Sequence, residues 1–121
     1  SRLDAVYEGV VGSLGEVPGR LAATAHASHA YGSGANLYFS FAARPADPQQ
    51  IPAVYAECWR RTMEATLAAG GGIAHHHGIG RVRRGWLAQE LGATGAALLL
   101  TIKDAVDPAG LLNPGALLPP R

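Results

Sequence analysis

The fold of this 121-residue chain is decided by the stretch Ser28-His29-Ala30-Tyr31-Gly32-Ser33-Gly34-Ala35-Asn36-Leu37-Tyr38-Phe39-Ser40-Phe41. A Gly-Ser-Gly group interrupts it, and apolar and polar residues alternate from Leu37 to Phe41. The residues before the glycines are small or β-prone. Two extended runs around a glycine-rich turn are typical of a β-hairpin, which we expect over residues 20–43.

Helical spacing of apolar residues flanks this hairpin on both sides. A short first helix is predicted by Leu3, Val6, Val10, Val11 and Leu14. A second helix follows the hairpin: Asp47 is its expected cap, Pro48 suits its first turn and Gly70 ends it. Its apolar face is Ile51, Val54, Tyr55, Cys58, Trp59, Thr62, Met63 and Thr66.

The second half of the chain is predicted to begin with a short strand or extended segment over residues 72–76. A helix over residues 81–91 follows, with Val82, Trp86, Leu87 and Leu91 inward. A last helix covers residues 94–105, and its apolar residues are Leu98, Leu99, Ile102 and Val106. This order of elements predicts one α+β domain over residues 1–121, with helices packed on one face of a small antiparallel sheet.

Composition narrows the function classes. Apolar residues make up 48% of the chain and charged residues 16%, which indicates a globular domain with surface buried against something else. The net charge is +1 and no basic stripe exists, so nucleic-acid binding is not expected. The single cysteine, Cys58, is typical of a reducing compartment, and no apolar run is long enough to span a membrane. We therefore expect a cytoplasmic protein and leave peripheral membrane association and a homodimer open.

Chemistry is expected at three adjacent histidines, His75, His76 and His77, which are three of only five in the chain. Successive side chains diverge, so the three imidazoles cannot all serve one site. Glycines on both sides allow backbone to approach a ligand closely. The alternative interpretation is an exposed loop without function.

Tyr38 and His29 are the other candidates, since a sheet could bring them beside the triplet and form an acid/base pair with it. A metal site of His29, His76 and His77 competes, but neither motif contains Asp or Glu, so we expect no metal. Arg83 lies in an arginine-rich helix start that suits a phosphate or carboxylate. Neither a phosphate loop nor a GxGxxG fingerprint is present.

Three motifs together carry a family resemblance: SHAYGSGANLYFSF, GGGIAHHHGIGRVRRGW and IKDAVDPAGLLNPGALLP. They resemble the C-terminal part of the FAD-linked oxidases related to vanillyl-alcohol oxidase, and within that group the alkyldihydroxyacetonephosphate synthase branch. The D-lactate and glycolate oxidase branches typically have a second His where Tyr38 stands and a Glu where His76 stands. This difference favours the synthase branch and removes two metal ligands.

The resemblance implies a substrate-side domain whose FAD is bound mainly by an N-terminal domain of the same polypeptide, and a chain that is inactive alone. The implied activity exchanges an acyl for an alkyl group on dihydroxyacetone phosphate, as in ether-lipid synthesis. His76 would be the base and Tyr38 the acid/base partner. The implied substrate- or flavin-side residues are His29, His75, His77, Arg83 and Asn113. The alternatives are an FAD-linked oxidase or dehydrogenase of a 2-hydroxy acid, and a non-catalytic binding domain.

Overall fold

The computed structural model describes residues 1–118 and divides the chain into two compact units, Ser1–Gly71 and Gly72–Arg121. The first unit contains helix α1 (Arg2–Gly15), strands β1 (Arg20–Tyr31) and β2 (Gly34–Ala43), the 3-10 turn η1 (Pro48–Gln50) and helix α2 (Ile51–Ala68). The second contains the long helix α3 (Gly80–Val106) between a loop and a C-terminal tail. In the described residues no helix is long and apolar enough to cross a membrane.

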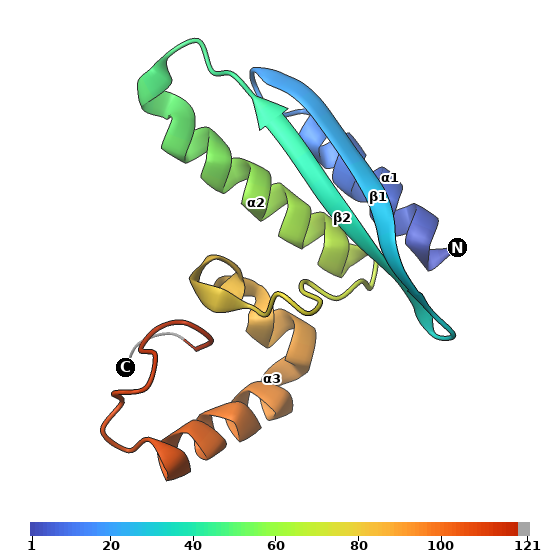
Figure 1. The fold of residues 1–121 in the computed structure, drawn as a ribbon. Helices are drawn as coiled ribbons and strands as arrows, with labels where there is room; N and C mark the ends of the chain where they lie inside the picture. The colour runs from blue at the N-terminus through green and yellow to red at the C-terminus, as the bar shows by residue number, and fades with distance from the viewer. Residues whose placement is uncertain (119–121) are drawn as a thin grey trace. The chain divides into compact units, whose positions relative to one another are not determined.

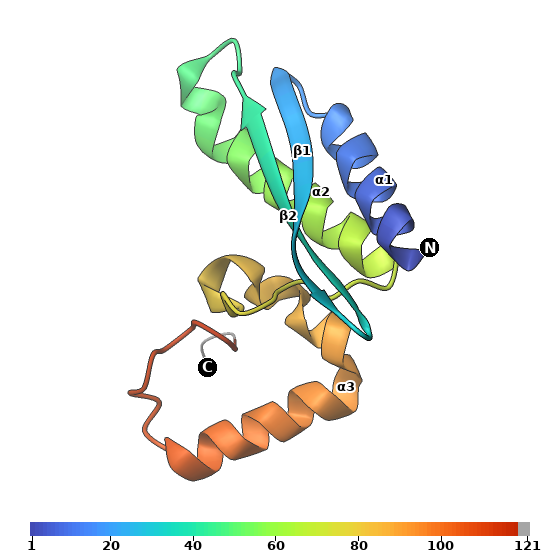
Figure 2. The same cartoon turned by 45° about the vertical axis from the view of Figure 1, so that its right-hand side comes forward.

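In the first unit, β1 and β2 form an antiparallel hairpin, and α1 and α2 lie on the same side of it (Figures 1 and 2). The prediction of an α+β fold with helices on one face of a small antiparallel sheet is confirmed. Asp47 and Pro48, expected to start the second helix, start the 3-10 turn that leads into it: the Asp47 side chain accepts from Gln49 N at 2.9 Å. Helix α2 itself begins at Ile51 without a side-chain cap.

The core of this unit lies between the helices and the hairpin. Val10, Leu14 and Cys58 are each no more than 2% exposed. They pack with Val6 and Val17 against inward-facing strand residues that include Leu37, Phe39 and Phe41. Burying one side chain such as Val10 or Leu14 contributes about 1.5–3 kcal/mol. Burial also raises the pKa of the Cys58 thiol, as expected for a packing residue.

An arginine on α2 forms hydrogen bonds with the C-terminal end of α1. Arg61 Nη1 donates to the Ser13 carbonyl at 3.1 Å and to Glu16 at 2.6 Å, while its Nε donates to Glu57 at 2.7 Å. Bonds from Arg60 and Arg61 lower the pKa of Glu57 to about 2. The two helices are therefore joined by polar contacts at one end as well as by the core.

In the second unit, α3 is broken at Gly92, whose φ of 70° and ψ of 172° are not helical. Such a backbone conformation is essentially restricted to glycine. The break separates two helical arms that agree with the two helices predicted over residues 81–91 and 94–105. The expected strand over residues 72–76 is wrong, since this segment has no regular structure.

The predicted inward faces of the two arms are only partly correct. Leu87 is buried, at 7% exposed, and Trp86 and Leu99 are half-buried. The other predicted inward residues are exposed: Val82, Leu91, Leu98, Ile102 and Val106. A unit of this size has too little of its own structure to cover two apolar helix faces.

Candidate functional site

Candidate residues of the first unit lie on the face of the hairpin opposite to α1 and α2, which we call the outer face. Leu37, Phe39 and Phe41 pack into the core, so the alternate residues of β2 point the other way. Directly paired residues of two strands share a face. The outer face therefore consists of Thr24, His26, His29, Tyr31, Asn36, Tyr38 and Ser40.

A bulge in β1 puts two histidines on this face. His26 pairs with Tyr38 and His29 pairs with Asn36, and the register shifts between Ala27 and His29. In a regular strand, residues three apart point to opposite faces. The extra residue at the bulge, Ser28, reverses the alternation, so His26 and His29 both face outward.

His26 and Tyr38 are in contact across the two strands. Their rings stack with centroids 5.4 Å apart and planes 11° from parallel. The prediction expected Tyr38 and His29 beside the triplet, and His26 was not among the predicted site residues. The signal that could have found His26 is the hairpin register, which requires knowledge of the bulge.

His29 is held by its neighbours instead. Its Nδ1 lies 2.9 Å from the Ser28 hydroxyl oxygen, which accepts a hydrogen bond from Asn36 Nδ2 at 2.8 Å. Its ring also stacks with Tyr31, with centroids 6.4 Å apart and planes 7° from parallel. The outer face thus carries two ordered imidazole–phenol pairs.

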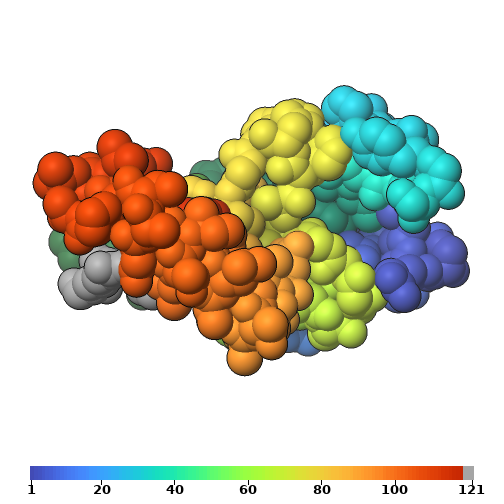
Figure 3. Space-filling model, turned by 90° about the horizontal axis from the view of Figure 1, so that it is seen from below, coloured from blue at the N-terminus to red at the C-terminus, as the bar shows by residue number. Residues whose placement is uncertain are grey.

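The histidine triplet lies in the loop that begins the second unit. Ile73, 4% exposed, anchors this loop, and its backbone N–H donates to Glu90 on α3 at 3.0 Å. Gly78, with φ of 71°, closes a turn in which its N–H donates to the His75 carbonyl at 3.3 Å. All three histidines are exposed, and Figure 3 shows this part of the chain (yellow) at the surface.

The three imidazoles contact one another in sequence. The ring centroids of His75 and His76 are 4.6 Å apart, and those of His76 and His77 are 4.4 Å apart. Nδ1 of His75 and Nδ1 of His76 are 2.6 Å apart. One of these nitrogens must donate and the other accept, so the contact needs at least one neutral ring.

The structure therefore places the predicted site residues in two groups. Tyr38 and His29 share the outer face of the hairpin in the first unit, and the triplet forms a cluster in the second. The expectation that a further strand would carry the triplet into the sheet is wrong, because residues 72–76 form a loop.

Arginines at the start of α3 hold the C-terminal tail. Arg84 Nη1 donates to the Gly115 carbonyl and Arg81 Nη2 to the Pro114 carbonyl, the latter at 3.4 Å. At the other end of the helix, Lys103 Nζ donates to the Leu112 carbonyl at 2.6 Å. These bonds lie on both sides of Asn113, which has a left-handed backbone with φ of 45°.

Asp107 completes this arrangement. It is 5% exposed, pairs with Lys103 and accepts from the N–H groups of Leu111 and Leu112, both at 2.9 Å. The bond from Lys103, followed by those from the two amides, holds the pKa of Asp107 below its usual value. An ionised carboxylate thus fixes the turn that starts the tail.

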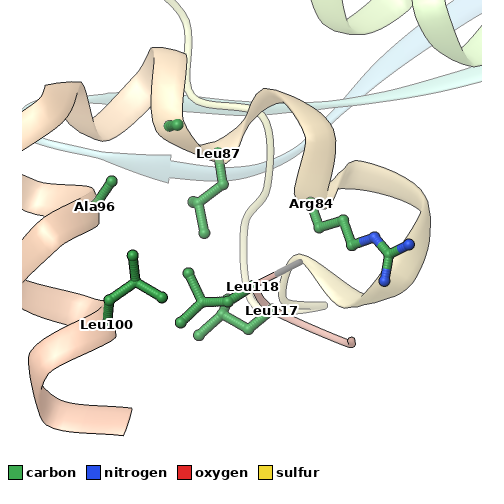
Figure 4. A pocket seen from close by; sticks show the side chains of 7 residues that line it. Arg84, Leu87, Ala96, Leu100, Leu117 and Leu118 are labelled. Carbon is green, nitrogen blue, oxygen red and sulfur yellow. The ribbon is translucent and has the colours of Figure 1, made fainter. Parts of the chain in front are cut away.

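Arg83, the predicted phosphate ligand, is half-buried near the start of α3. Its Nε lies 3.4 Å from the Ile79 carbonyl of its own turn, at the long end of hydrogen-bond distances. A hollow of about 130 Å³ lies between the arms and the tail, lined by Leu87, Leu100, Leu117 and Leu118 (Figure 4). It is smaller than the roughly 300–1,000 Å³ of typical ligand pockets, so we assign it no ligand.

Comparison with known proteins agrees with these features. Residues 1–117 match the family model described as "FAD linked oxidases, C-terminal domain". The chain is 36% identical, over 78% of its length, to an alkyldihydroxyacetonephosphate synthase of Trypanosoma brucei brucei, of which it covers 15%. It is 33% identical, over 79% of its length, to the protein of that name in Caenorhabditis elegans, of which it covers 16%.

A relative with a different name is equally similar. The chain is 35% identical, over 78% of its length, to the uncharacterized FAD-linked oxidoreductase YgcU of Escherichia coli (strain K12), of which it covers 20%. The chain thus spans between 15 and 20% of the length of these relatives. The resemblance seen in the sequence motifs is confirmed at the level of the family.

Proposed function

Since this chain belongs to the family of C-terminal domains of FAD-linked oxidases, we propose that it forms the substrate-facing part of a longer FAD-dependent enzyme. We propose further that this enzyme exchanges an acyl for an alkyl group on dihydroxyacetone phosphate. The observation that carries the proposal is the identity of 36% to a synthase of that name, which extends over 78% of this chain.

The side chains on the outer face of the hairpin suit a position beside the substrate rather than around the pyrophosphate of FAD. A pyrophosphate needs positive charge or a cluster of backbone N–H groups. The outer face of the hairpin offers neither, because its members are imidazoles, phenols, hydroxyls and one amide. When bound, the flavin supplies a reactive centre that accepts electrons from the substrate, while this chain binds and orients the substrate and moves protons.

His76 is the proposed base that takes a proton from a substrate carbon. Its Nδ1 faces His75 at 2.6 Å, so a proton taken from substrate would go to its Nε2. His75 then fixes the orientation of the His76 ring, as a partner on the second nitrogen does for many catalytic imidazoles. His77, whose ring centroid is 4.4 Å from that of His76, has the proposed role of a substrate- or flavin-side group.

Tyr38 is the proposed acid/base partner, acting through its phenol at the substrate oxygen. Its half-buried ring is on the outer face, where it stacks on His26. His29, ordered by Ser28 and Tyr31, is proposed to bind a polar part of the substrate. Proton transfer by such positioned groups contributes roughly 10²–10⁴-fold to a rate.

Two further residues of the second unit have proposed roles. Arg83, near the start of α3, is the proposed ligand of the substrate phosphate, because a guanidinium binds phosphate oxygens through charge-assisted hydrogen bonds. Asn113 is fixed between carbonyls that Lys103, Arg81 and Arg84 hold. We propose that it faces the flavin-binding domain.

Oxidation of a 2-hydroxy acid is the second candidate activity. It is favoured by the identity of 35% to a protein named FAD-linked oxidoreductase. The two activities differ in electron balance, because oxidation leaves two electrons on the flavin whereas the acyl-for-alkyl exchange leaves none.

A flavin absorbance spectrum of the full-length protein tests the proposal. Acyl-dihydroxyacetone phosphate with a fatty alcohol is added to one sample and a series of 2-hydroxy acids to others, all without oxygen. Ether product without lasting bleaching supports the synthase. Bleaching by a hydroxy acid replaces it with the oxidase, and a protein without flavin contradicts both.

A further inference from the structure

We propose that His26 is a positioning residue that sets the orientation of the Tyr38 phenol, an inference that rests on the proposed acid/base role of Tyr38. The direct observation is the stacked pair, with ring centroids 5.4 Å apart and planes 11° from parallel. Such nearly parallel contact between two rings is a favourable arrangement for aromatic side chains. It holds the Tyr38 ring from the side of β1.

The backbone makes this contact obligatory. The turn at Gly32 and Ser33 pairs Tyr31 with Gly34, and the bulge at Ser28 then shifts the register by one. If the strands instead paired regularly from the turn, with Ser28 kept and no bulge, Tyr38 would pair with Ala27, whose methyl group offers no ring to stack on. The bulge is thus what delivers an imidazole to the face of the phenol.

The stacked contact of Tyr38 with His26 lies on the face of the hairpin away from the helices. Both helices cover the opposite face of the hairpin, and the next residues on the outer face of β2 are the small polar Asn36 and Ser40. Rotation about the Cα–Cβ bond swings the ring and its phenol oxygen between staggered positions. A ring stacked on one side has fewer orientations, and its hydroxyl points in fewer directions.

His29 cannot replace His26 in this role. It pairs with Asn36, and its ring is engaged with Ser28 and Tyr31. Thr24, which pairs with Ser40, is on the same strand and face as His26, and it has no ring. Thr24 therefore provides a matched control for substitutions on the outer face.

The kinetic test uses the full-length flavoprotein and the substrate that the spectral experiment identifies. His26→Ala should lower kcat by about ten-fold or more and change KM by less than about two-fold, because misorientation of a reacting group slows chemistry more than binding. His26→Phe retains a flat ring and should restore kcat to within about three-fold of wild type. Thr24→Ala should leave both constants unchanged.

A double-substitution cycle distinguishes positioning from a separate role of His26. In a Tyr38→Phe background, His26→Ala should cause no further loss, because a residue that acts through the phenol has no effect once the phenol is gone. An equal loss in both backgrounds overturns the inference and leaves the proposed function intact. Failure of His26→Phe to restore kcat overturns it as well.

A spectroscopic readout makes the inference testable even if neither activity is found. With 3-fluorotyrosine placed at position 38 of the full-length protein, the fluorine resonance should move in His26→Ala and stay in place in Thr24→Ala. A resonance that does not respond to His26→Ala overturns the contact. A protein that shows the shift but turns over no substrate retains the contact and contradicts the proposed function alone.

Discussion

Asn36 donates a hydrogen bond from its side-chain amide to the Ser28 hydroxyl oxygen, at 2.8 Å, across the point where β1 bulges. This bond joins the extra residue of one strand to the facing residue of the other. It stabilises the irregularity that puts His26 and His29 on one face.

Deletion of Ser28 should leave the hairpin intact, since the pairs on both sides of the bulge remain compatible with regular alternation. Hydrogen exchange of the hairpin amides in the full-length protein should change little. Deletion of Ala25 is the control: it turns Thr24 inward and Ala23 outward, so exchange should become much faster. Equal acceleration in both variants would show that the bulge itself is required for folding.

Replacement of Leu14 by Ala should lower the free energy of unfolding by about 2–5 kcal/mol, because Leu14 is 1% exposed and a cavity would remain. Leu21→Ala should cost less than about 0.5 kcal/mol, since Leu21 is 62% exposed. Denaturant unfolding of the two variants measures the difference. Similar losses would mean that Leu21 is buried against a part of the longer protein.

Acid should release the C-terminal tail. In an unfolded chain Asp has a pKa near 3.9, and Lys103 together with the amides of Leu112 and Leu111 lowers the pKa of Asp107 in the folded chain. The stabilisation is thus complete above about pH 4 and is lost as the pH falls through the lowered folded pKa. Hydrogen exchange at Leu111 and Leu112 should accelerate there.

The matched variants for this pH dependence are Asp107→Asn and Asp104→Asn. In Asp107→Asn the amides of Leu111 and Leu112 should exchange faster already at neutral pH. The further increase in their exchange rate in acid, the acid-dependent step, should become smaller. Asp104→Asn should retain the step. An unchanged step in Asp107→Asn would assign the acid effect to another carboxylate.

His76→Ala in the full-length protein should lower turnover by about 100-fold or more while the flavin stays bound. The substitution removes the proposed base but removes no proposed contact to the cofactor. The bound-flavin absorbance and kcat are measured on the same preparation. Gln49→Ala, in the exposed turn before α2, is the control, and it should change neither the bound-flavin absorbance nor kcat. Loss of flavin together with activity would make the triplet structural.

The helices and the hairpin were predictable because their signals are local. Apolar spacing, the Asp47-Pro48 start and the glycine-rich turn each act within a few residues. Even the break in α3 was anticipated, since the two helical patterns stop on either side of Gly92. Family membership was likewise readable from the motifs around Tyr38 and His76.

The register of the hairpin could not be predicted in the same way. β1 contains five alanines, Ala22, Ala23, Ala25, Ala27 and Ala30, and their similarity leaves no large side chain to mark the inward positions. The apolar residues of β2 determine which face of the hairpin packs on the core, and the turn fixes the strand pairing at the other end of the hairpin. The bulge reconciles the pairing that the turn fixes with the pairing that the apolar residues of β2 require. His26 was therefore not predicted as a site residue.

The strand predicted over residues 72–76 failed for a related reason. A strand needs a partner, and the sequence around Ile73 shows only that one apolar side chain is to be buried. The structure anchors Ile73 through Glu90, a residue 17 positions later on a helix, and no local pattern specifies that contact.

The non-helical backbone at Gly92 shortens the distance that the tail must span to return to the start of α3. In an unbroken helix, residues 81 and 106 would be about 38 Å apart along the axis. The eight residues from Val106 to Pro114 reach at most about 28 Å when fully extended, and this segment contains turns. On a straight rod the bonds from Arg81 and Arg84 would require this segment to be nearly fully extended, so its turns are compatible with those bonds only because one glycine breaks the helix.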